Sequence, residues 1–569
     1  MNALKGNGVS PGIAVGNIFI YGTTQIIPDE GLCAPGEEQA QIDQYGAVKK
    51  KAIDELKHLV ARMEKNDPEK AKIFTAHQDI VNDVAINEEI PGKIQNEHWN
   101  GDWAIYKIYE NFIRMVKKAK DPLIAERASD FEDVRGRLLR LWHGGSEKGL
   151  HAPGRQVIIA ARELLPSDTA SMDPCKVLAI LTETGGLTSH SAIIARSYGI
   201  PAILGIPALL ENVRQDQRAV VNAVEGTVYL DPDTAMIDEY AKKTEAWRKE
   251  KENTEVFRKI NAHTKDNVKI DIALNIASAD EKELEAAGYT DSVGLFRTEF
   301  LYMGRPDLPP EEEQFYLYKK VLESFAPRPV TLRTLDIGGD KTLESMGLPK
   351  EENPFLGNRA LRLCFANPEI FTTQIRACLR AAMYGNLWIM LPMVGSMDDI
   401  RRAQEFIQKA KDGLKKEGVP CGDYKLGIMV EIPSIALVAG HAAKEVDFAS
   451  IGSNDLCQYL CAADRMNSAV ENYYQSYHPA LFKLIGETVK AFANEGKPVS
   501  VCGELGGDPL AAPVLVGLGV TKLSMGAASV ANIKRTISCL TMEKAVEMAQ
   551  KVLELATDNE VRTYLLENS

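Results

Sequence analysis

The feature of this sequence that most restricts its fold is a pattern that begins near residue 268 and continues for about 300 residues. Short apolar runs alternate there with helical patterns; the runs are VKIDIALN (268–275), SVGLFRTE (292–299), VTLRTLDIG (330–338), LWIMLPM (387–393), KLGIMVEI (425–432), DFASIGS (447–453), PVSVCGE (498–504) and TKLSMG (521–526). A buried strand followed by a helix is the repeating unit of parallel β/α folds. Eight units in a segment of this length predict a C-terminal (β/α)8 TIM barrel.

The segment at 35–145 has a different pattern. Apolar residues recur at the spacing of amphipathic helices, first in Tyr45, Val48, Ala52, Leu56, Leu59 and Met63. Similar patterns continue through 70–90, 101–120 and 125–142. We expect an all-helical unit of about four helices here.

Residues 156–230 change character again, with short β-rich runs such as QVIIAAREL, KVLAILTE and RAVVNAV. We expect a compact α/β domain that also recruits the strand segment at 8–21, so that the helical unit is an insertion into it. The predicted domains of this multidomain α/β chain are 1–30 plus 146–232 (the α/β domain), 31–145 (the helical insertion), 233–262 (a charged linker helix) and 263–569 (the barrel).

The composition excludes several classes of protein. The formal net charge is -13, with 79 acidic and 66 basic residues, which argues against a nucleic-acid partner. No apolar stretch reaches the roughly 18 residues of a membrane span, and the first residues do not have the pattern of a signal peptide. Nine scattered cysteines without a C-x-x-C pair indicate free thiols in a reducing cytoplasm. Cys457 and Cys461, four residues apart, are expected to be small buried apolar side chains rather than metal ligands.

Polar side chains gather where the predicted barrel strands end. They are Arg297 and Glu299, Arg333 and Asp336, Glu431, Asn454 and Asp455, and Cys502 and Glu504. The C-terminal ends of the strands line the active-site mouth of a TIM barrel, so these residues predict one site. The chemical types of these side chains indicate which ligands the predicted site would bind. The carboxylates of Glu431 and Asp455 suit Mg²⁺, or Mn²⁺. Arginine side chains match phosphate and carboxylate groups, and four are candidates: Arg297, Arg333, Arg359 and Arg465.

A second candidate site is GGLTSHSAIIARSYGIPAI, residues 185–203. Thr188 or Ser189 can cap the helix that follows, and its free N–H groups would then attract an anion beside His190. A neutral imidazole is nucleophilic near neutral pH, so His190 could carry a phosphoryl group. The alternative is a structural histidine at a helix N-terminus.

The motifs decide between these two interpretations. GG-x-TSH-[ST]-A-I-x-AR followed by GIPAI resembles the phosphohistidine motif of the phosphoenolpyruvate-utilising enzymes. The barrel sequences TLDIGGDK, ENPFLGNRALR, GIMVEIPS, IGSNDLCQYLCAADR and CGELGGD are similar to those of Enzyme I of the bacterial phosphotransferase system, the phosphoenolpyruvate-protein phosphotransferases, and occur in the same order. The resemblance extends to SPGIAVG near the N-terminus and KIFTAHQDI in the helical insertion.

This resemblance implies a role for each candidate residue. His190 would accept the phosphoryl group of phosphoenolpyruvate and pass it to the phosphocarrier HPr, releasing pyruvate as the first step of sugar uptake. Glu431 and Asp455 would bind Mg²⁺, and Cys502 would protonate the enolate. The substrate would be held by Arg297, Arg333, Asn454 and Arg465, with Arg359 nearby. Thr169 and His77 would lie near the resting His190, the insertion would dock HPr, and the barrel would form a homodimer.

The sequence departs from the family pattern at Leu187, where Arg is usual, at Asn358, where an aromatic residue is usual, and at Leu460, where Thr is usual. These departures put local packing and carrier preference in doubt.

Three alternatives to this function remain. One is a relative of pyruvate phosphate dikinase or phosphoenolpyruvate synthase, which would need an ATP-binding domain that the residues before the histidine domain do not provide. Another is a regulatory phosphotransferase paralogue, whose extra N-terminal sensory domain is not expected here. The third is a lyase of the same barrel superfamily, which would leave GGLTSH unexplained.

Overall fold

The computed structural model describes residues 3–21, 27–28, 30–63, 68–117, 127–144, 155–164, 168, 172–185, 189–303, 305, 307–338 and 351–568. The chain forms two compact units, Met1–Glu250 and Lys251–Ser569. Each unit has hydrophobic cores of its own.

The first unit contains a sheet formed from two distant parts of the chain. Before the helical segment come β1 (Ala3–Lys5), β2 (Asn7–Ser10) and β3 (Ile13–Ile20); after it come β4 (Val157–Ala161), β5 (Val177–Thr182), β6 (Ala202–Leu204), β7 (Arg218–Asn222) and β8 (Thr227–Leu230). The order in the sheet is β1-β8-β7-β3-β4-β5-β6-β2. Because β3 pairs with β4 on one side and β7 on the other, the N-terminal strands are integral to the sheet. Helix α8 (His190–Tyr198) lies between β5 and β6 in the chain, and helix α9 (Leu209–Asn212) lies between β6 and β7.

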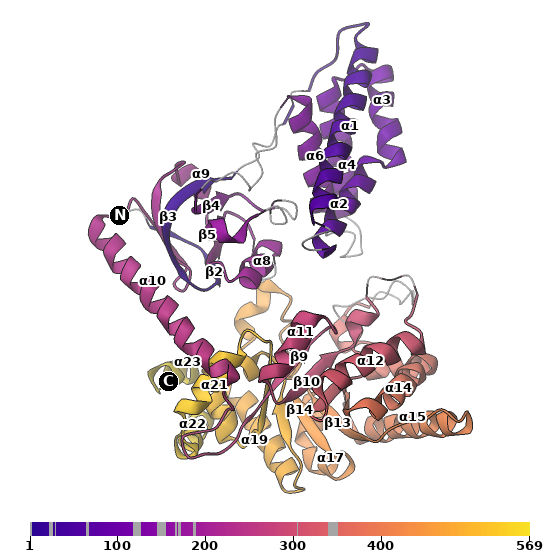
Figure 1. Ribbon diagram of the computed structural model, residues 1–569, viewed down its shortest axis with the longest axis vertical. Coiled ribbons are helices and arrows are strands. Elements are labelled where there is room, and N and C mark those ends of the chain that lie inside the picture. Colours follow the sequence, from indigo (N-terminus) through magenta and orange to yellow (C-terminus); the bar gives the residue numbers. More distant parts are fainter. Residues whose placement is uncertain are drawn as a thin grey trace. The chain divides into compact units, whose positions relative to one another are not determined.

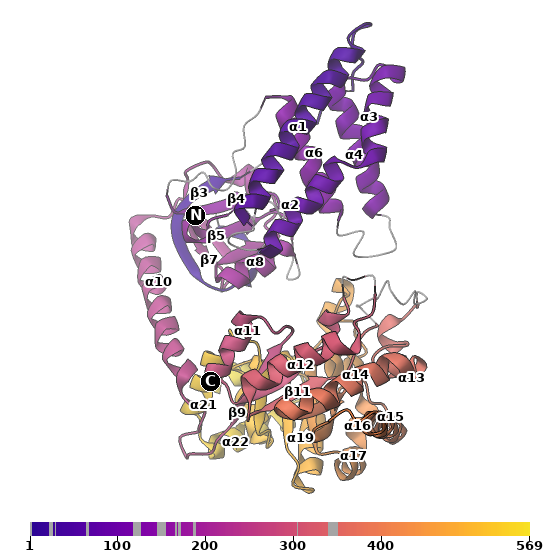
Figure 2. The same ribbon diagram turned by 45° about the vertical axis from the view of Figure 1, so that its right-hand side comes forward.

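The segment between β3 and β4 is helical, as predicted. Its described helices are α1 (Glu38–Met63), α2 (Pro68–Val81), α3 (Val84–Glu97), α4 (Gly101–Lys117) and α6 (Ala128–Trp142), which lie side by side in Figures 1 and 2. The predicted apolar stripe packs inward, since Tyr45, Val48, Ala52, Leu56 and Leu59 are all buried.

One helix prediction was wrong, because the pattern over 70–90 is divided between α2 and α3. Asp83 leaves the helical conformation at the break, and its side chain accepts the backbone N–H of Ile86 at 3.1 Å. An aspartate that caps the next helix in this way competes with continuation of the helix before it.

The helix α10 (Thr234–Glu255), followed by a short 3-10 turn at Val256–Lys259, lies within the predicted linker segment.

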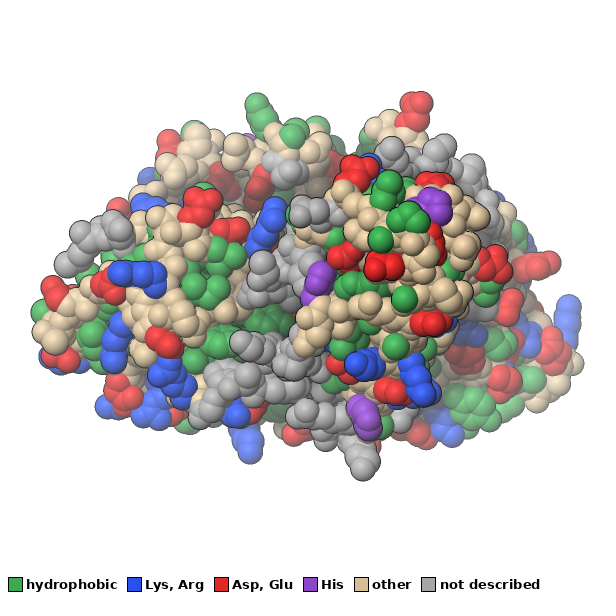
Figure 3. All heavy atoms as spheres, turned by 90° about the horizontal axis from the view of Figure 1, so that it is seen from above, with side chains coloured by type: hydrophobic (Ala, Val, Ile, Leu, Met, Phe, Trp, Pro, Cys, Tyr) green, Lys and Arg blue, Asp and Glu red, His purple; other side chains and the backbone are tan. Residues whose placement is uncertain are grey.

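Figure 3 shows acidic and basic side chains interspersed on one face of the molecule, in keeping with a modest net negative charge. None of the helices described has both the length and the apolar character that a membrane crossing requires.

The second unit is the predicted barrel, which is confirmed. Its strands are β9 (Asp271–Ile276), β10 (Ser292–Arg297), β11 (Pro329–Arg333), β12 (Asn386–Leu391), β13 (Tyr424–Val430), β14 (Phe448–Ile451), β15 (Val499–Val501) and β16 (Lys522–Met525). All neighbouring pairs are parallel, and β16 pairs with β9 to close the barrel.

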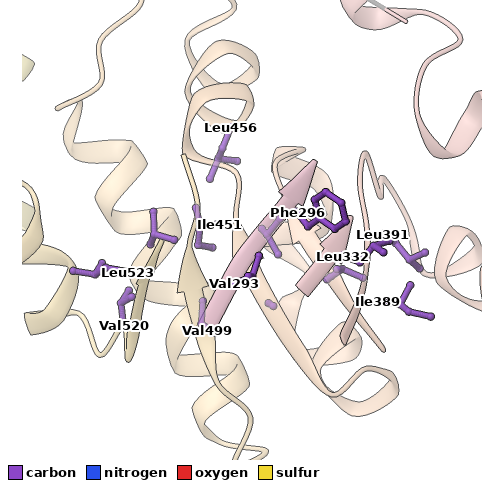
Figure 4. Close-up of a cluster of buried hydrophobic side chains, with 14 of the residues drawn as sticks. Val293, Phe296, Leu332, Ile389, Leu391, Ile451, Leu456, Val499, Val520 and Leu523 are labelled. Carbon is purple, nitrogen blue, oxygen red and sulfur yellow. The ribbon is translucent and has the colours of Figure 1, made fainter. Parts of the chain in front are cut away.

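Helices cover the outside of this barrel, as Figure 2 shows for α12 and α14. They are α11 (Glu281–Glu285), α12 (Glu311–Phe325), α13 (Leu361–Ala366), α14 (Pro368–Ala381), α15 (Met397–Lys416), α16 (Pro433–Leu437), α17 (Ala439–Glu445), α18 (Ser453–Cys461), α19 (Pro479–Ala493), α20 (Ala512–Gly517), α21 (Val530–Cys539), α22 (Met542–Glu554) and α23 (Asp558–Asn568). The main core lies between strands and helices, where Figure 4 shows side chains such as Leu332, Ile389 and Leu523.

The interior of the barrel holds a second, smaller core. Side chains alternate between the two faces of a strand, so the neighbours of outward-facing residues point inward. Leu295, Trp388, Met390, Met429, Phe448 and Cys502 form this cluster. A Cβ at Gly427 would lie 2.5 Å from the Phe448 ring, so glycine leaves the space that the ring occupies. Cys502 therefore belongs to the apolar interior directly beneath the strand ends.

Candidate active site

The closed parallel barrel brings the predicted site residues to one edge. Arg297 is the last residue of β10, Arg333 is the last residue of β11, and Glu431 directly follows β13. Asn454 and Asp455 lie in the first turn of α18, which follows β14, and Cys502 directly follows β15. This is the C-terminal edge of the strands, where TIM-barrel active sites lie.

Arg333 is held by carboxylates on both sides of it. Its side chain is 7% exposed and forms ion pairs with Glu299 and with Asp336, the latter at 2.8 Å between Nη1 and Oδ2. Burying a guanidinium away from water is costly unless it is paired, so both acids stabilise its charged form. Its Nε–H group, also buried, has no hydrogen-bond acceptor among the described residues.

Arg359 extends the same network towards α18. Its Nη2 lies 2.9 Å from Asp336 Oδ1 and its Nη1 lies 3.3 Å from Asp455 Oδ1. Arg465 Nη1 lies 3.7 Å from Asp455 Oδ2. The buried Nε–H of Arg359 is a second donor without an acceptor in the described part of the chain. A Cβ at Gly338, where φ is +108°, would lie 2.4 Å from the Cβ of Arg359, so this approach requires glycine.

Glu431 is fully buried, and only one of its two carboxylate oxygens has a hydrogen-bond partner among the described residues. Its Oε1 accepts the backbone N–H of Met393 at 2.6 Å, whereas Oε2 has no partner within the described residues. A Cβ at Gly452 would lie 2.9 Å from that Oε2, so glycine keeps the space beside the oxygen open. Burial, followed by the nearby carboxylates of Asp455 and Asp336, raises the pKa of Glu431 to about 8.

These carboxylates fit a divalent cation. A buried carboxylate oxygen without a partner costs on the order of 1–3 kcal/mol, which a bound cation would recover. Glu431 and Asp455 offer only hard oxygen donors, the ligands that Mg²⁺ prefers. Within the described ranges, no group of three or more His, Cys, Asp or Glu side chains is placed to hold a metal ion. A cation here would therefore need further oxygens from substrate or water.

The Cys502 thiol faces the same edge from inside the barrel. Its Sγ lies 3.5 Å from the carbonyl oxygen of Ile451. Burial raises the pKa of Cys502 to about 11, against the lowering effects of Ser450, Arg333 and Arg297. The side chain is therefore a thiol at neutral pH and is able to donate a proton.

Asn454 borders a cavity of about 210 Å³, whose lining also includes Ser453, Tyr474 and Glu504. Asn454 Oδ1 accepts the backbone N–H of Glu504 at 2.9 Å, which fixes the orientation of its side-chain amide. The N–H₂ end of the same planar amide is fixed with it and can donate hydrogen bonds.

The GGLTSH segment is described only in part. His190 is the first residue of α8, and Ser189 is its N-cap, accepting the backbone N–H of Ala192 at 3.3 Å. Of the two predicted capping residues, Ser189 therefore caps the helix. The side chain of His190 lies outside the described part of the structure, as do Thr188 and Thr169.

His77, which the resemblance placed near His190, is fully buried within the helical segment. Its Nε2 lies 3.4 Å from Asp130 Oδ1, and its ring packs edge-on against Phe74 at 6.1 Å. These contacts support a structural role. Its predicted proximity to His190 remains a prediction.

Sequence reasoning missed several residues that support the site. Asn275 Nδ2 donates to the carbonyl oxygen of Cys502 at 3.0 Å, and Asn275 Oδ1 accepts from the Ser524 hydroxyl at 2.6 Å. Gln458 Oε1 accepts the backbone N–H of Arg465 at 3.0 Å, and the Tyr459 hydroxyl lies 3.3 Å from Arg359 Nη1. The isolated asparagine in the apolar run DIALNI was a signal that could have identified the first of these.

Comparison with known proteins gives matches along the whole chain. Residues 251–542 match the family model "PEP-utilising enzyme, PEP-binding domain", residues 153–226 match its "mobile domain", and residues 5–127 match its "N-terminal" model. Among curated relatives, the phosphoenolpyruvate-protein phosphotransferase of Bacillus subtilis (strain 168) is 39% identical over 578 residues, covering 100% of both chains. That of Priestia megaterium is 40% identical over 565 residues, covering 98% of this chain and 97% of the relative.

Proposed function

The chain belongs to the phosphoenolpyruvate-protein phosphotransferases, and we propose that it moves the phosphoryl group of phosphoenolpyruvate to its own His190 and then to the histidine of HPr. One observation supports this most: among the described residues, Arg333 and Arg359 each keep a buried donor without an acceptor, and Glu431 keeps a buried acceptor without a donor, at the same strand edge. A doubly anionic substrate with a divalent cation satisfies both kinds of group at once.

The substrate is proposed to lie among the arginines of the barrel edge. A planar guanidinium matches the oxygens of phosphate and carboxylate, and both groups are present in phosphoenolpyruvate. The residues proposed to hold it are Arg297, Arg333, Arg359, Asn454 and Arg465. Arg333 and Arg359 are already held by carboxylates, so binding costs little side-chain ordering.

Glu431 and Asp455 are the proposed ligands of Mg²⁺, or of Mn²⁺. The cation, when bound, would neutralise charge on the phosphate and the developing enolate. Burial and the neighbouring carboxylates raise the pKa of Glu431, so a proton on this carboxyl must leave before it can act as a ligand. Asp455 is proposed to bind the cation, and its ion pairs with Arg359 and Arg465 connect it to two of the residues proposed to hold the substrate.

Cys502 is the proposed proton donor. When the phosphoryl group leaves, the enolate of pyruvate must gain a proton at carbon. The Cys502 thiol remains protonated at neutral pH and lies in the apolar floor beneath the arginines, where water does not compete. Asn275 holds the backbone carbonyl of this residue and so fixes its position.

His190 is the proposed phosphoryl acceptor. It lies at the N-terminus of α8, where Ser189 uses only one of the free backbone N–H groups. The remaining N–H groups and the helix dipole favour an anion on the imidazole ring. Thr188 and Thr169 are proposed to assist there.

The remaining proposals concern partners. We assign the helical insertion at 31–145 to HPr docking, the α/β domain (1–30 plus 146–232) to His190, the helix within 233–262 to the linker, and the barrel at 263–569 to substrate binding and to a homodimer. A cytoplasmic location fits the nine free cysteines. Since His190 and the substrate site belong to different units, a movement of the units between the two transfers is part of the proposal.

Phosphoenolpyruvate, Mg²⁺ and purified HPr test this function together. We expect pyruvate release and label on HPr without ATP. A requirement for ATP would support the dikinase or synthase alternative. Full autophosphorylation without HPr acceptance would support a regulatory paralogue. The full-length matches to phosphotransferases favour the first outcome.

A further inference from the structure

Two of the arginines proposed to hold the substrate share one aromatic ring. Phe355 lies in the 3-10 turn Pro354–Leu356, shortly before Arg359 in the chain. The guanidinium carbon of Arg359 lies 5.7 Å from the centre of the Phe355 ring, and that of Arg465 lies 5.9 Å from the same centre. A cation at such a distance over an aromatic face is attracted by the negative charge of that face. Side chains from two distant segments of the barrel therefore meet on Phe355.

The same two arginines also meet on one carboxylate. Asp455 Oδ1 lies 3.3 Å from Arg359 Nη1, and Asp455 Oδ2 lies 3.7 Å from Arg465 Nη1. The ion pair places a nitrogen of each guanidinium, and the Phe355 ring adds a contact to the carbon of the same group. Each guanidinium is thus held by two kinds of contact before any substrate is bound.

Helix α18 holds the turn that carries the ring. The Tyr459 hydroxyl donates to the backbone carbonyl oxygen of Phe355 at 2.5 Å and accepts from Arg359 Nη1 at 3.3 Å. Tyr459 follows Asp455 by one turn of α18, so the two side chains lie on the same face of that helix. The Phe355 turn, the two arginines and this helix face therefore form one connected set of contacts.

We propose that Phe355 is a positioning residue for phosphoenolpyruvate: its ring orders Arg359 and Arg465 for the anionic groups of the substrate. This role rests on the proposed function. Phe355 acts through the two arginines and takes no part in the chemical step. The buried Nε–H of Arg359, which has no acceptor among the described residues, is a donor that this arrangement keeps for the substrate. Because both guanidiniums are ordered beforehand, substrate binding loses less side-chain entropy.

Replacement of the ring tests this role. Phe355→Leu keeps an apolar side chain and removes the aromatic face. We expect the KM for phosphoenolpyruvate to rise about tenfold, because binding must then order two arginine side chains. The kcat should stay within about twofold of the parent value, since a contact that serves ground state and transition state equally changes KM alone. Phe355→Tyr keeps the ring and should have the KM of the parent. Transfer between phospho-HPr and His190 does not use these arginines and should be unchanged in both variants.

Tyr384→Leu is the matched control. Lys319 Nζ lies 4.1 Å from the centre of the Tyr384 ring, so this variant also replaces a ring that a cation covers. Tyr384 lies shortly before β12 begins, at the N-terminal edge of the barrel and away from the substrate arginines. Its KM should equal that of the parent.

A second variant acts on the support of the ring. Tyr459→Phe removes the hydroxyl that holds the Phe355 carbonyl and keeps the rest of the side chain. We expect the KM to rise about threefold with kcat unchanged, the order of effect of one lost hydrogen bond. This variant decides the question if Phe355→Leu does not fold.

Arginine side-chain NMR signals give a measurement that needs no enzyme activity. The Nε–H signals of Arg359 and Arg465, assigned from lysine replacements, should be displaced by the ring current in the parent and in Phe355→Tyr. They should lose that displacement in Phe355→Leu. If the parent takes no phosphoryl group from phosphoenolpyruvate, the proposed function fails, while these signals still decide whether the ring holds the two arginines.

Three results would overturn the positioning role. The KM of Phe355→Leu could equal that of the parent, or Phe355→Tyr could be impaired as much as Phe355→Leu. In the third case, kcat and the unfolding temperature of Phe355→Leu would fall while KM stayed the same, which would show that the ring only packs.

Discussion

At the scale of single residues, Asp336 shows that a position in the site could be predicted from the sequence, whereas the contacts made there could not. Arg333 and Asp336 could be placed at the barrel mouth because they end a predicted strand. That Asp336 bridges Arg333 and Arg359 could not be predicted, since Arg359 comes from a later segment with no strand to fix its position. The same holds for Asn275 and Cys502, which meet only because β9 and β15 lie on either side of β16.

Replacement of Cys502 by Ala should slow pyruvate release by roughly 100-fold or more, the usual contribution of a positioned acid. The pKa of Cys502, raised to about 11, also predicts a pH dependence. The donor is the protonated form, so its contribution should persist through pH 9 and decline only as the pH approaches 11. Steady-state pyruvate release measured across pH 7–11 checks both points. Cys378→Ala, at another buried cysteine, is the matched control; an equal loss in that variant would point to packing rather than proton donation.

Replacement of Glu431 by Gln should abolish tight Mg²⁺ binding while preserving the buried shape. In the parent protein the raised pKa of about 8 means that binding must expel a proton below that pH. Affinity should therefore rise about tenfold per pH unit towards pH 8 and level off above it. Calorimetry in buffers of different ionisation enthalpy measures the released proton. Affinity independent of pH between 6 and 8 would remove Glu431 from the ligand set.

At the scale of elements, the barrel strands were predictable because each is a short apolar run between helical patterns. Each of the eight predicted runs overlaps one strand of the closed barrel, with ends differing by a few residues. The order of the N-terminal sheet was not predictable, since antiparallel pairs such as β1 with β8 join segments more than 200 residues apart. The break at Asp83 depended on a single capping side chain within an otherwise continuous pattern.

Helix α8 provides a test at this scale. Ser189→Ala removes the side chain that caps it and should cost about 1 kcal/mol of stability. Ser189→Thr keeps a hydroxyl cap and should restore most of that loss. Thermal unfolding of the N-terminal unit, compared across the three proteins, measures the effect. If the alanine variant unfolded at the parent's temperature, Ser189 would not be stabilising the helix start that presents His190.

At the scale of the whole molecule, the two units should separate the two half-reactions. A fragment that ends near residue 260 contains complete cores of its own and should fold. It retains His190 and the helical insertion and should exchange phosphate with phospho-HPr. It has lost Arg333, Glu431 and Cys502 and should not react with phosphoenolpyruvate. Incubation of the folded fragment with each donor separately tests the division; labelling by phosphoenolpyruvate alone would show that the barrel is not the substrate site.

The central claim is that phosphoenolpyruvate phosphorylates His190. The most direct measurement is to incubate the full chain with labelled phosphoenolpyruvate and Mg²⁺, then locate the label by peptide mapping. The account predicts one acid-labile, base-stable phosphoryl group on His190, and none on a folded His190→Ala protein. Undiminished label on that variant, or label that is stable to acid, would contradict it.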